Sequence, residues 1–114
     1  MASIERTAYP RFKSALSTQE LQTLYDPSDE EREFVFAHTP GTTQQLTLLT
    51  LLKSHQYLGY LPAVDDIPIQ IRSYLCRQLS LPPETALHET KHYRSRYRQL
   101  IHAYLNVKAY SAGG

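Results

Sequence analysis

The fold depends above all on one leucine-rich stretch, which reads Leu46-Thr47-Leu48-Leu49-Thr50-Leu51-Leu52-Lys53-Ser54-His55-Gln56-Tyr57-Leu58-Gly59. Its apolar residues cover a broad arc of a helix, which is typical of the central helix of a bundle. Thr42 or Thr43 is expected to cap this helix. Gly59 is expected to end it, because glycine readily adopts the left-handed conformation found after many helices.

Two shorter helices are predicted before this stretch, and each begins with a capping box, in which a serine side chain and a glutamate three residues later satisfy free backbone groups. The boxes lie in residues 17–20 and 28–31. The first helix is expected to run to about Tyr25 and the second to about His38.

Two further helices are predicted after residue 60. Asp66 is expected to cap the first, with Pro68 in its opening turn, and its apolar face consists of Ile71, Tyr74, Leu75 and Leu79. The last helix is expected from about Glu89 to Asn106, with an apolar stripe formed by Tyr93, Tyr97, Leu100, Ile101, Tyr104 and Leu105.

These elements predict an all-α fold, a compact bundle of about five helices with helix-turn-helix character. We expect one domain over residues 1–110, or alternatively two small lobes over residues 1–61 and 66–110, followed by a flexible tail or hinge at residues 111–114.

Composition places the protein among soluble domains. The chain has 114 residues, of which 41% are hydrophobic and 20% charged, and no apolar run approaches the roughly 18–20 residues that cross a bilayer. The first residues have no apolar core of a signal peptide, and the single cysteine, Cys76, cannot form an internal disulfide. A cytoplasmic protein is therefore expected.

Charge is unevenly distributed along the chain. Residues 17–40 contain six acidic residues and one arginine, a net charge of −5, whereas residues 89–108 contain five basic residues and one glutamate, a net charge of +4. A polyanion would be attracted to the last helix and repelled by the acidic segment.

The last helix carries its cations beside the apolar stripe. Arg94, Arg98 and His102 form a row with spacing i, i+4, i+8, Lys91 lies close to this row, and Arg96 lies on the other flank. Guanidinium groups on a rigid helix suit contacts to phosphates or guanine edges. The alternative is that these arginines are only the solvated face of an amphipathic helix. The segment of residues 6–13, which alternates cations with aromatic residues, would be either an arm along DNA or a strap packed on the bundle.

Residues 88–92 match the zinc-protease signature H-E-x-x-H, but the match is interpreted as fortuitous. No acidic residue follows Glu89 to act as a third ligand, and Ser95 and Arg98 occupy the positions where the longer signature has glycine and histidine. No other catalytic constellation is found, so we expect no catalysis, no metal and no cofactor.

Three blocks of the sequence resemble the N-terminal region of the large replicative transposases of the Tn-three family. They are Arg6-Thr7-Ala8-Tyr9-Pro10-Arg11-Phe12 with the following Leu16 to Leu21 segment, Leu51 to Pro62 continuing to Asp66-Ile67-Pro68, and Arg96-Tyr97-Arg98-Gln99-Leu100-Ile101. Tyr97 and His102 differ from the histidine and arginine that the family usually has there.

The resemblance implies a DNA-binding module that recognises the terminal inverted repeats of a transposon. The catalytic acidic triad of that family belongs to a downstream domain that this chain does not contain, so the chain itself is expected not to be an enzyme. Expected partners are double-stranded DNA and other transposase domains or a second transposase copy, without a membrane. The expected DNA-facing residues are Arg94, Arg98, Arg96 and Lys91, assisted by Arg6, Arg11, Lys13, Arg72, Arg77 and Lys53.

An alternative function is protein interaction. In this hypothesis the acidic second helix or the tyrosine-rich surface docks another transposase segment or a host factor, and the chain is a helical interaction module or a truncated transposase-derived regulator. Salt dependence separates the two hypotheses, because DNA binding weakens steeply with salt through counterion release.

Overall fold

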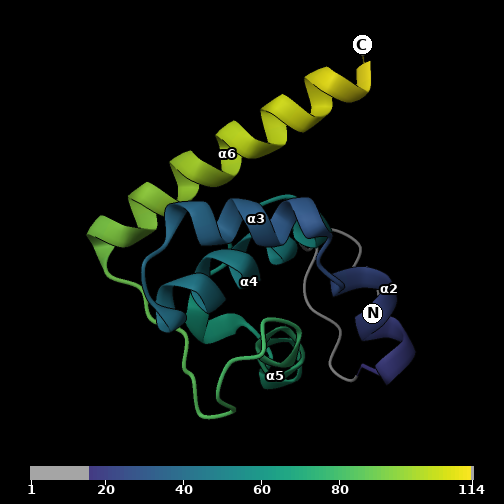
Figure 1. Ribbon diagram of the computed structural model, residues 1–114, viewed down its shortest axis with the longest axis vertical. Helices are drawn as coiled ribbons and strands as arrows, with labels where there is room; N and C mark the ends of the chain where they lie inside the picture. The colour runs from purple at the N-terminus through teal and green to yellow at the C-terminus, as the bar shows by residue number, and fades with distance from the viewer. Residues whose placement is uncertain (1–15, 114) are drawn as a thin grey trace, which may run out of the picture.

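A computed structural model describes the backbone of residues 16–113 and the side chains of residues 16–107. This part of the chain contains five α-helices, one 3-10 turn and no strand (Figure 1). The α-helices are α2 (Thr18–Tyr25), α3 (Asp29–His38), α4 (Thr42–Leu58), α5 (Ile69–Gln78) and α6 (Lys91–Gly113), and the 3-10 turn is η1 (Val64–Asp66). The all-helical prediction is confirmed.

The two predicted capping boxes are both formed. The Ser17 hydroxyl accepts the Glu20 N–H at 3.2 Å while the Glu20 carboxylate accepts the Ser17 N–H at 2.9 Å. Ser28 and Glu31 repeat this exchange at 3.1 and 2.8 Å. Each box satisfies backbone donors that have no partner inside the helix, which explains why α2 and α3 begin where the sequence predicted.

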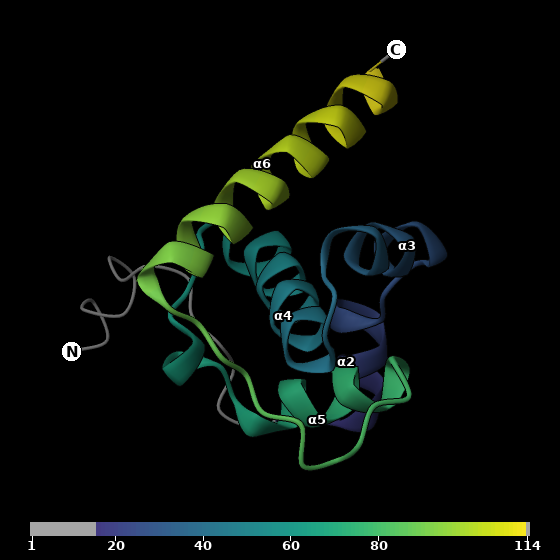
Figure 2. The same cartoon turned by 60° about the vertical axis from the view of Figure 1, so that its left-hand side comes forward.

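Helix α4 is the central helix of the bundle, packed against α2, α3, α5 and α6 (Figure 2). Its segment 46–54 is buried on all sides. Gly59 ends the helix with φ of 86°, and its N–H donates to the His55 carbonyl, as predicted. The predicted N-cap was wrong: Gly41 caps α4, because the Gln44 side chain already accepts the Gly41 N–H at 3.1 Å.

The connection from α4 to α5 differs from the prediction. Asp66 is the last residue of η1, and Pro68 is the N-cap of α5 rather than a residue of its first turn. The reason is steric: a residue before proline is disfavoured in helical conformation, and Ile67 is extended with ψ of 125°. The Pro68 carbonyl accepts the N–H groups of Ile71 and Arg72 and so opens the helix.

Helix α6 begins two residues later and ends later than predicted. Thr90 accepts the Tyr93 N–H with its hydroxyl at 3.2 Å, which sets the start, and the helix continues to Gly113 rather than ending near Asn106. Residues 111–113, expected as a tail, therefore continue the helix. No proline interrupts residues 107–113, and proline is the strongest helix breaker.

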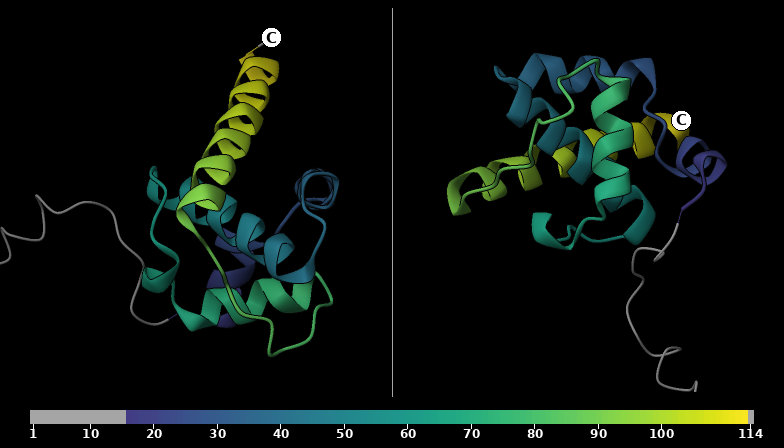
Figure 3. Two further views of the ribbon diagram at one scale, coloured as in Figure 1. Left: turned by 90° about the vertical axis from the view of Figure 1, so that its left-hand side faces the viewer. Right: turned by 90° about the horizontal axis from the view of Figure 1, so that it is seen from below.

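One apolar core joins the described elements. It extends from Leu16 to Ile101 and includes residues on both sides of the 61–66 segment. Helix α6 contributes Tyr97 and Ile101 to this core through its first half, while its C-terminal end extends beyond the other helices (Figure 3). The fold thus fixes one end of α6 and leaves the other projecting.

Candidate nucleic-acid interface

The predicted apolar stripe of α6 faces the bundle. Tyr97 and Ile101 are buried, and Tyr93, Leu100, Tyr104 and Leu105 pack at the edge of the core. The ring of Tyr104 stacks on Phe34 of α3, with centroids 4.5 Å apart. This packing fixes the rotation of the helix about its axis, so the face opposite the stripe is turned to solvent.

That outer face is basic and polar. Lys91, Arg96 and Arg98 are exposed, as are Ser95 and Gln99. At about 100° per residue, Lys91 and Arg98 lie on one shoulder of the helix and Arg96 on the other, with Ser95 and Gln99 between them. The side chains of the three cations have no hydrogen-bond or ion-pair partner among residues 16–107.

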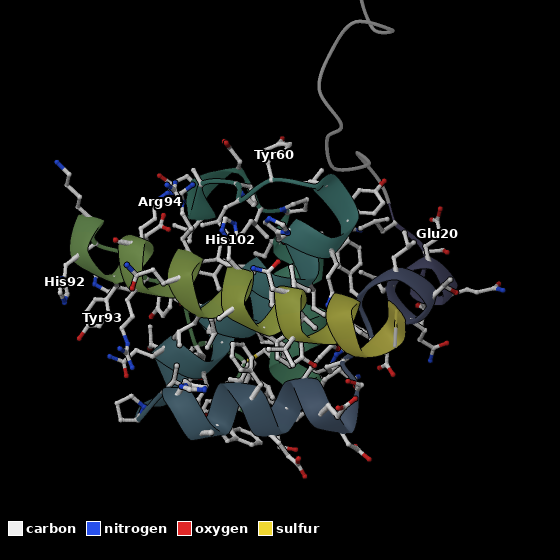
Figure 4. The ribbon with its side chains drawn as sticks, turned by 90° about the horizontal axis from the view of Figure 1, so that it is seen from above. Glu20, Tyr60, His92, Tyr93, Arg94 and His102 are labelled. Atoms are coloured by element: carbon white, nitrogen blue, oxygen red, sulfur yellow. The ribbon has the colours of Figure 1, made fainter. Side chains whose placement is uncertain are left out.

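Arg94 has a different environment from its neighbours. Its guanidinium donates to the Leu61 carbonyl at 2.8 Å and the Pro62 carbonyl at 3.0 Å, and it forms an ion pair with Glu89 at 2.8 Å. Arg94 points to the same side of α6 as Tyr60 and His102, whereas Tyr93 points to the other side (Figure 4). Arg94 therefore ties α6 to the loop after α4, and three of the five N–H donors of its guanidinium are used within the protein.

Lys53 and Arg72 also have structural partners. Lys53 is buried and forms an ion pair with Glu31 at 3.1 Å, and Arg72 donates to the Thr85 carbonyl at 2.7 Å. These contacts join α4 to α3 and α5 to the loop before α6. We therefore leave both residues out of the DNA-facing set, because their charged groups are held within the protein.

The Glu31 carboxylate is held ionised by its partners. Burial alone would raise the pKa of Glu31, but hydrogen bonds from Gln56, from the Ser28 backbone and from Lys53, together with the Lys53 charge, lower it below its ordinary value of 4.5. The Gln56 amide donates at 2.7 Å. Glu31 is thus a buried anion whose charge is fully matched.

The remaining predicted residues lie elsewhere. Arg77 is exposed on α5, which lies on the other side of the molecule from α6 in Figures 1 and 2. Arg6, Arg11 and Lys13 lie outside the described residues, as does the predicted arm. The structure therefore brings together Lys91, Arg96 and Arg98 and separates them from Arg77.

The segment matching the zinc signature does not form the helix that this chemistry uses. His88 and Glu89 precede α6, and the Glu89 carboxylate is paired with Arg94. His88 and His92 therefore do not share one helical face. Among the described residues, no group of three or more His, Cys, Asp or Glu side chains is placed to hold a metal ion.

A model of the domain of unknown function DUF4158 matches residues 1–114, the whole length of the chain. The chain belongs to the DUF4158 family. No curated protein and no solved structure matches it. In the described part of this DUF4158 domain, none of the helices combines the length and the hydropathy that a bilayer-spanning segment requires.

Two histidines connect α4 and α6 in the DUF4158 domain. The rings of His55 and His102 meet edge to face with centroids 5.5 Å apart. Burial lowers the pKa of His55 below its ordinary value of 6.5, and the His102 charge lowers it further. A positive charge on His102 therefore disfavours a proton on His55.

A pocket that no sequence motif indicates lies between α6 and the α3–α4 turn. It has a volume of about 230 Å³, and its lining includes His38, Gln44, Tyr93, Arg96 and Tyr97. Arg96 was predicted as a DNA contact, but the others carry no local motif. Because they come from three separate elements, no spacing in the sequence could have revealed that they converge.

Proposed function

We propose that this DUF4158 domain binds double-stranded DNA through the outer face of α6, as the end-recognition module of a transposase. The observation that carries the proposal is the exposed, acid-free surface of Lys91, Arg96 and Arg98, none of which has a partner among residues 16–107. The resemblance to Tn-three family transposases supports the terminal inverted repeats of a transposon as the target.

The arrangement on α6 suits a helix lying in a major groove. Cations on two shoulders would contact phosphates on the two sides of the groove, which positions a protein without reading sequence. Between them, Ser95 and Gln99 present hydroxyl and amide groups, and an amide can pair bidentately with adenine. These residues lie in the first half of α6, on the face turned away from the core, and the C-terminal end of the helix extends beyond the other helices (Figure 3).

The acidic helix α3 supports an orientation for this complex. Its exposed residues Asp29, Glu30 and Glu33 would be repelled by phosphates, so the duplex would lie on the outer face of α6 and away from α3. In this proposal catalysis belongs to another domain of the transposase, and this chain supplies binding alone.

The test is a fluorescence-anisotropy titration of a labelled terminal-repeat duplex against a scrambled duplex of equal length, at several salt concentrations. We expect tighter binding to the repeat and an affinity that falls linearly with salt on logarithmic axes. If Arg98 contacts a base, R98Q should lose about 1–3 kcal/mol of binding free energy. If Arg98 contacts a phosphate, R98Q should instead reduce the slope of log affinity against log salt concentration by about 1. R77Q is the matched control and should bind like the wild type. Absence of binding to either duplex at low salt would refute the proposal.

A second candidate function, protein docking, is favoured by one observation. Phe36 on α3 is 48% exposed, next to the acidic residues of that helix. An apolar ring bordered by carboxylates suits a basic partner segment, such as another domain of the same transposase. Binding of such a segment that F36S abolishes and R98Q leaves unchanged would support this function.

A further inference from the structure

The pocket beside α6 is built from the ends of two helices and the side of a third. His38 is the last residue of α3, Gln44 lies in the first turn of α4, and Tyr93, Arg96 and Tyr97 come from α6. The C-terminus of α3 and the N-terminus of α4 carry opposite partial charges. Because these partial charges have opposite signs, an anion site in the pocket depends on the side chains that line it.

The side chains that line the pocket offer mainly hydrogen-bond donors. Arg96 is a permanent cation without a partner among residues 16–107, and His38 has no hydrogen bond there, only a ring contact with Phe34. The Tyr93 hydroxyl accepts from the Gln44 amide at 3.4 Å, which leaves its own proton free to donate. No carboxylate is found in the described lining of the pocket. Such a donor set matches an anion with several oxygens.

Tyr97 provides an independent observation. Its side chain is 2% exposed, and its hydroxyl is buried with no hydrogen-bond partner in the described structure. A buried hydroxyl without a partner is destabilising, and native proteins keep few of them. Burial raises the pKa of Tyr97, the Tyr93 and Glu89 charges raise it further, and the Arg96 charge lowers it. The hydroxyl is therefore a neutral donor without an acceptor, on a residue that lines the same pocket as Arg96.

We propose that this pocket binds a phosphoryl group, held by the Arg96 guanidinium and by the hydroxyls of Tyr93 and Tyr97. The anion would supply the acceptor that the Tyr97 hydroxyl lacks. Phosphate oxygens come from two sources, a DNA backbone or a free phosphate. The assignment of the DNA backbone as the source rests on the proposed function, because it requires a duplex on α6.

The test is a titration of the full chain with inorganic phosphate, followed by NMR through the arginine side-chain N–H signals and the backbone N–H signals of residues 38–44 and 93–97. Four variants accompany the wild type. R96Q and Y97F change the pocket, R77Q removes an exposed cation on α5, and Y25F removes another buried tyrosine hydroxyl without a partner, one that lies outside the pocket.

We expect saturable shifts at Arg96 and at the α3–α4 turn. Loss of one charge-assisted contact should weaken phosphate binding about tenfold in R96Q, and loss of one hydroxyl should weaken it about three- to tenfold in Y97F. R77Q and Y25F should bind phosphate like the wild type. Y97F should also melt at the same or a higher temperature without phosphate, since it removes an unsatisfied group; a purely structural role for the hydroxyl would lower the melting temperature.

A parallel titration with duplex DNA separates the pocket from the proposed function. Weaker duplex binding by both R96Q and Y97F supports a backbone phosphate in the pocket. Phosphate binding that both variants weaken, without any duplex binding, supports the pocket and overturns the DNA proposal alone. Duplex binding that Y97F leaves unchanged, together with no saturable phosphate shifts, overturns the pocket and leaves DNA binding intact.

Discussion

Helices α4 and α6 use their cations in opposite ways. Residues 46–54 of α4 are buried throughout, and the one cation among them, Lys53, is paired with a buried carboxylate. Helix α6 buries Tyr97 and Ile101 and exposes Arg96 and Arg98, which have no partner among residues 16–107. A buried cation needs a partner of opposite charge inside the protein, so it serves the stability of the fold. A cation on the exposed face of a helix that packs by its other face stays available to a ligand.

Arg94 shows that paired and available cations can lie on the same helix. It belongs to α6, yet its guanidinium is occupied by the carbonyls of Leu61 and Pro62 and by Glu89. Only a few residues separate it from Arg96 and Arg98. The difference between a structural and an available arginine is therefore set by what faces each side of the helix, and substitutions can test it.

The largest expected effect is at the α4 ion pair. K53M leaves the Glu31 carboxylate buried without its cation, and removing one partner of a buried pair costs about 3–5 kcal/mol. We expect this loss in the free energy of unfolding, measured by urea denaturation at neutral pH. R77M, which removes an exposed cation, is the control and should change stability by less than about 0.5 kcal/mol.

The pH dependence of K53M sharpens this prediction. In the wild type the pKa of Glu31 is below 4.5 in the folded state, so its contribution to stability is present above the unfolded pKa and is lost as the pH falls through the folded value. Without Lys53, protonation of Glu31 relieves the unmatched charge. The deficit of K53M should therefore shrink in acid, and a deficit that is constant with pH would contradict this account.

A smaller effect is expected at Arg94. R94Q removes donors from two loop carbonyls and a cation from Glu89, which we expect to destabilise the protein by about 1–3 kcal/mol. R98Q on the same helix should leave urea stability unchanged within about 0.5 kcal/mol. Equal stabilities for the two variants would show that Arg94 is not a structural residue and would remove the contrast between them.

The smallest effect is expected at the histidine contact between α4 and α6. Because the folded state lowers the pKa of His55 below 6.5, mainly by burial and then by the His102 charge, the unfolded chain takes up a proton first and acid favours unfolding. Wild-type stability should decrease as the pH falls below 6.5, and H55Q should show a shallower decrease over the same range. Parallel pH profiles of urea stability for the two proteins would rule out this contribution.

Much of the fold could be predicted because its signals are local. Each capping box joins residues three apart, and Gly59 ends α4 through a bond to His55, four residues before it. The apolar stripe on α6 could be predicted because its residues recur with the period of an α-helix. Errors arose where longer side chains or proline sterics changed a boundary, as with Gly41, whose N–H is taken by Gln44, and Pro68, which forces Ile67 to be extended.

Sequence alone therefore determined an all-helical chain with a basic last helix, and tertiary structure decided which of its cations are available. Three of the cations bond to residues far away in the sequence: the separation is 22 residues for Lys53, 13 for Arg72 and 33 for Arg94. A pattern within one helix cannot predict such pairs. The same holds for the pocket, whose residues meet only when α6 packs against the α3–α4 turn. Helix signals act within a few residues through backbone hydrogen bonds, whereas burial and pairing of a charge depend on every element that packs around it.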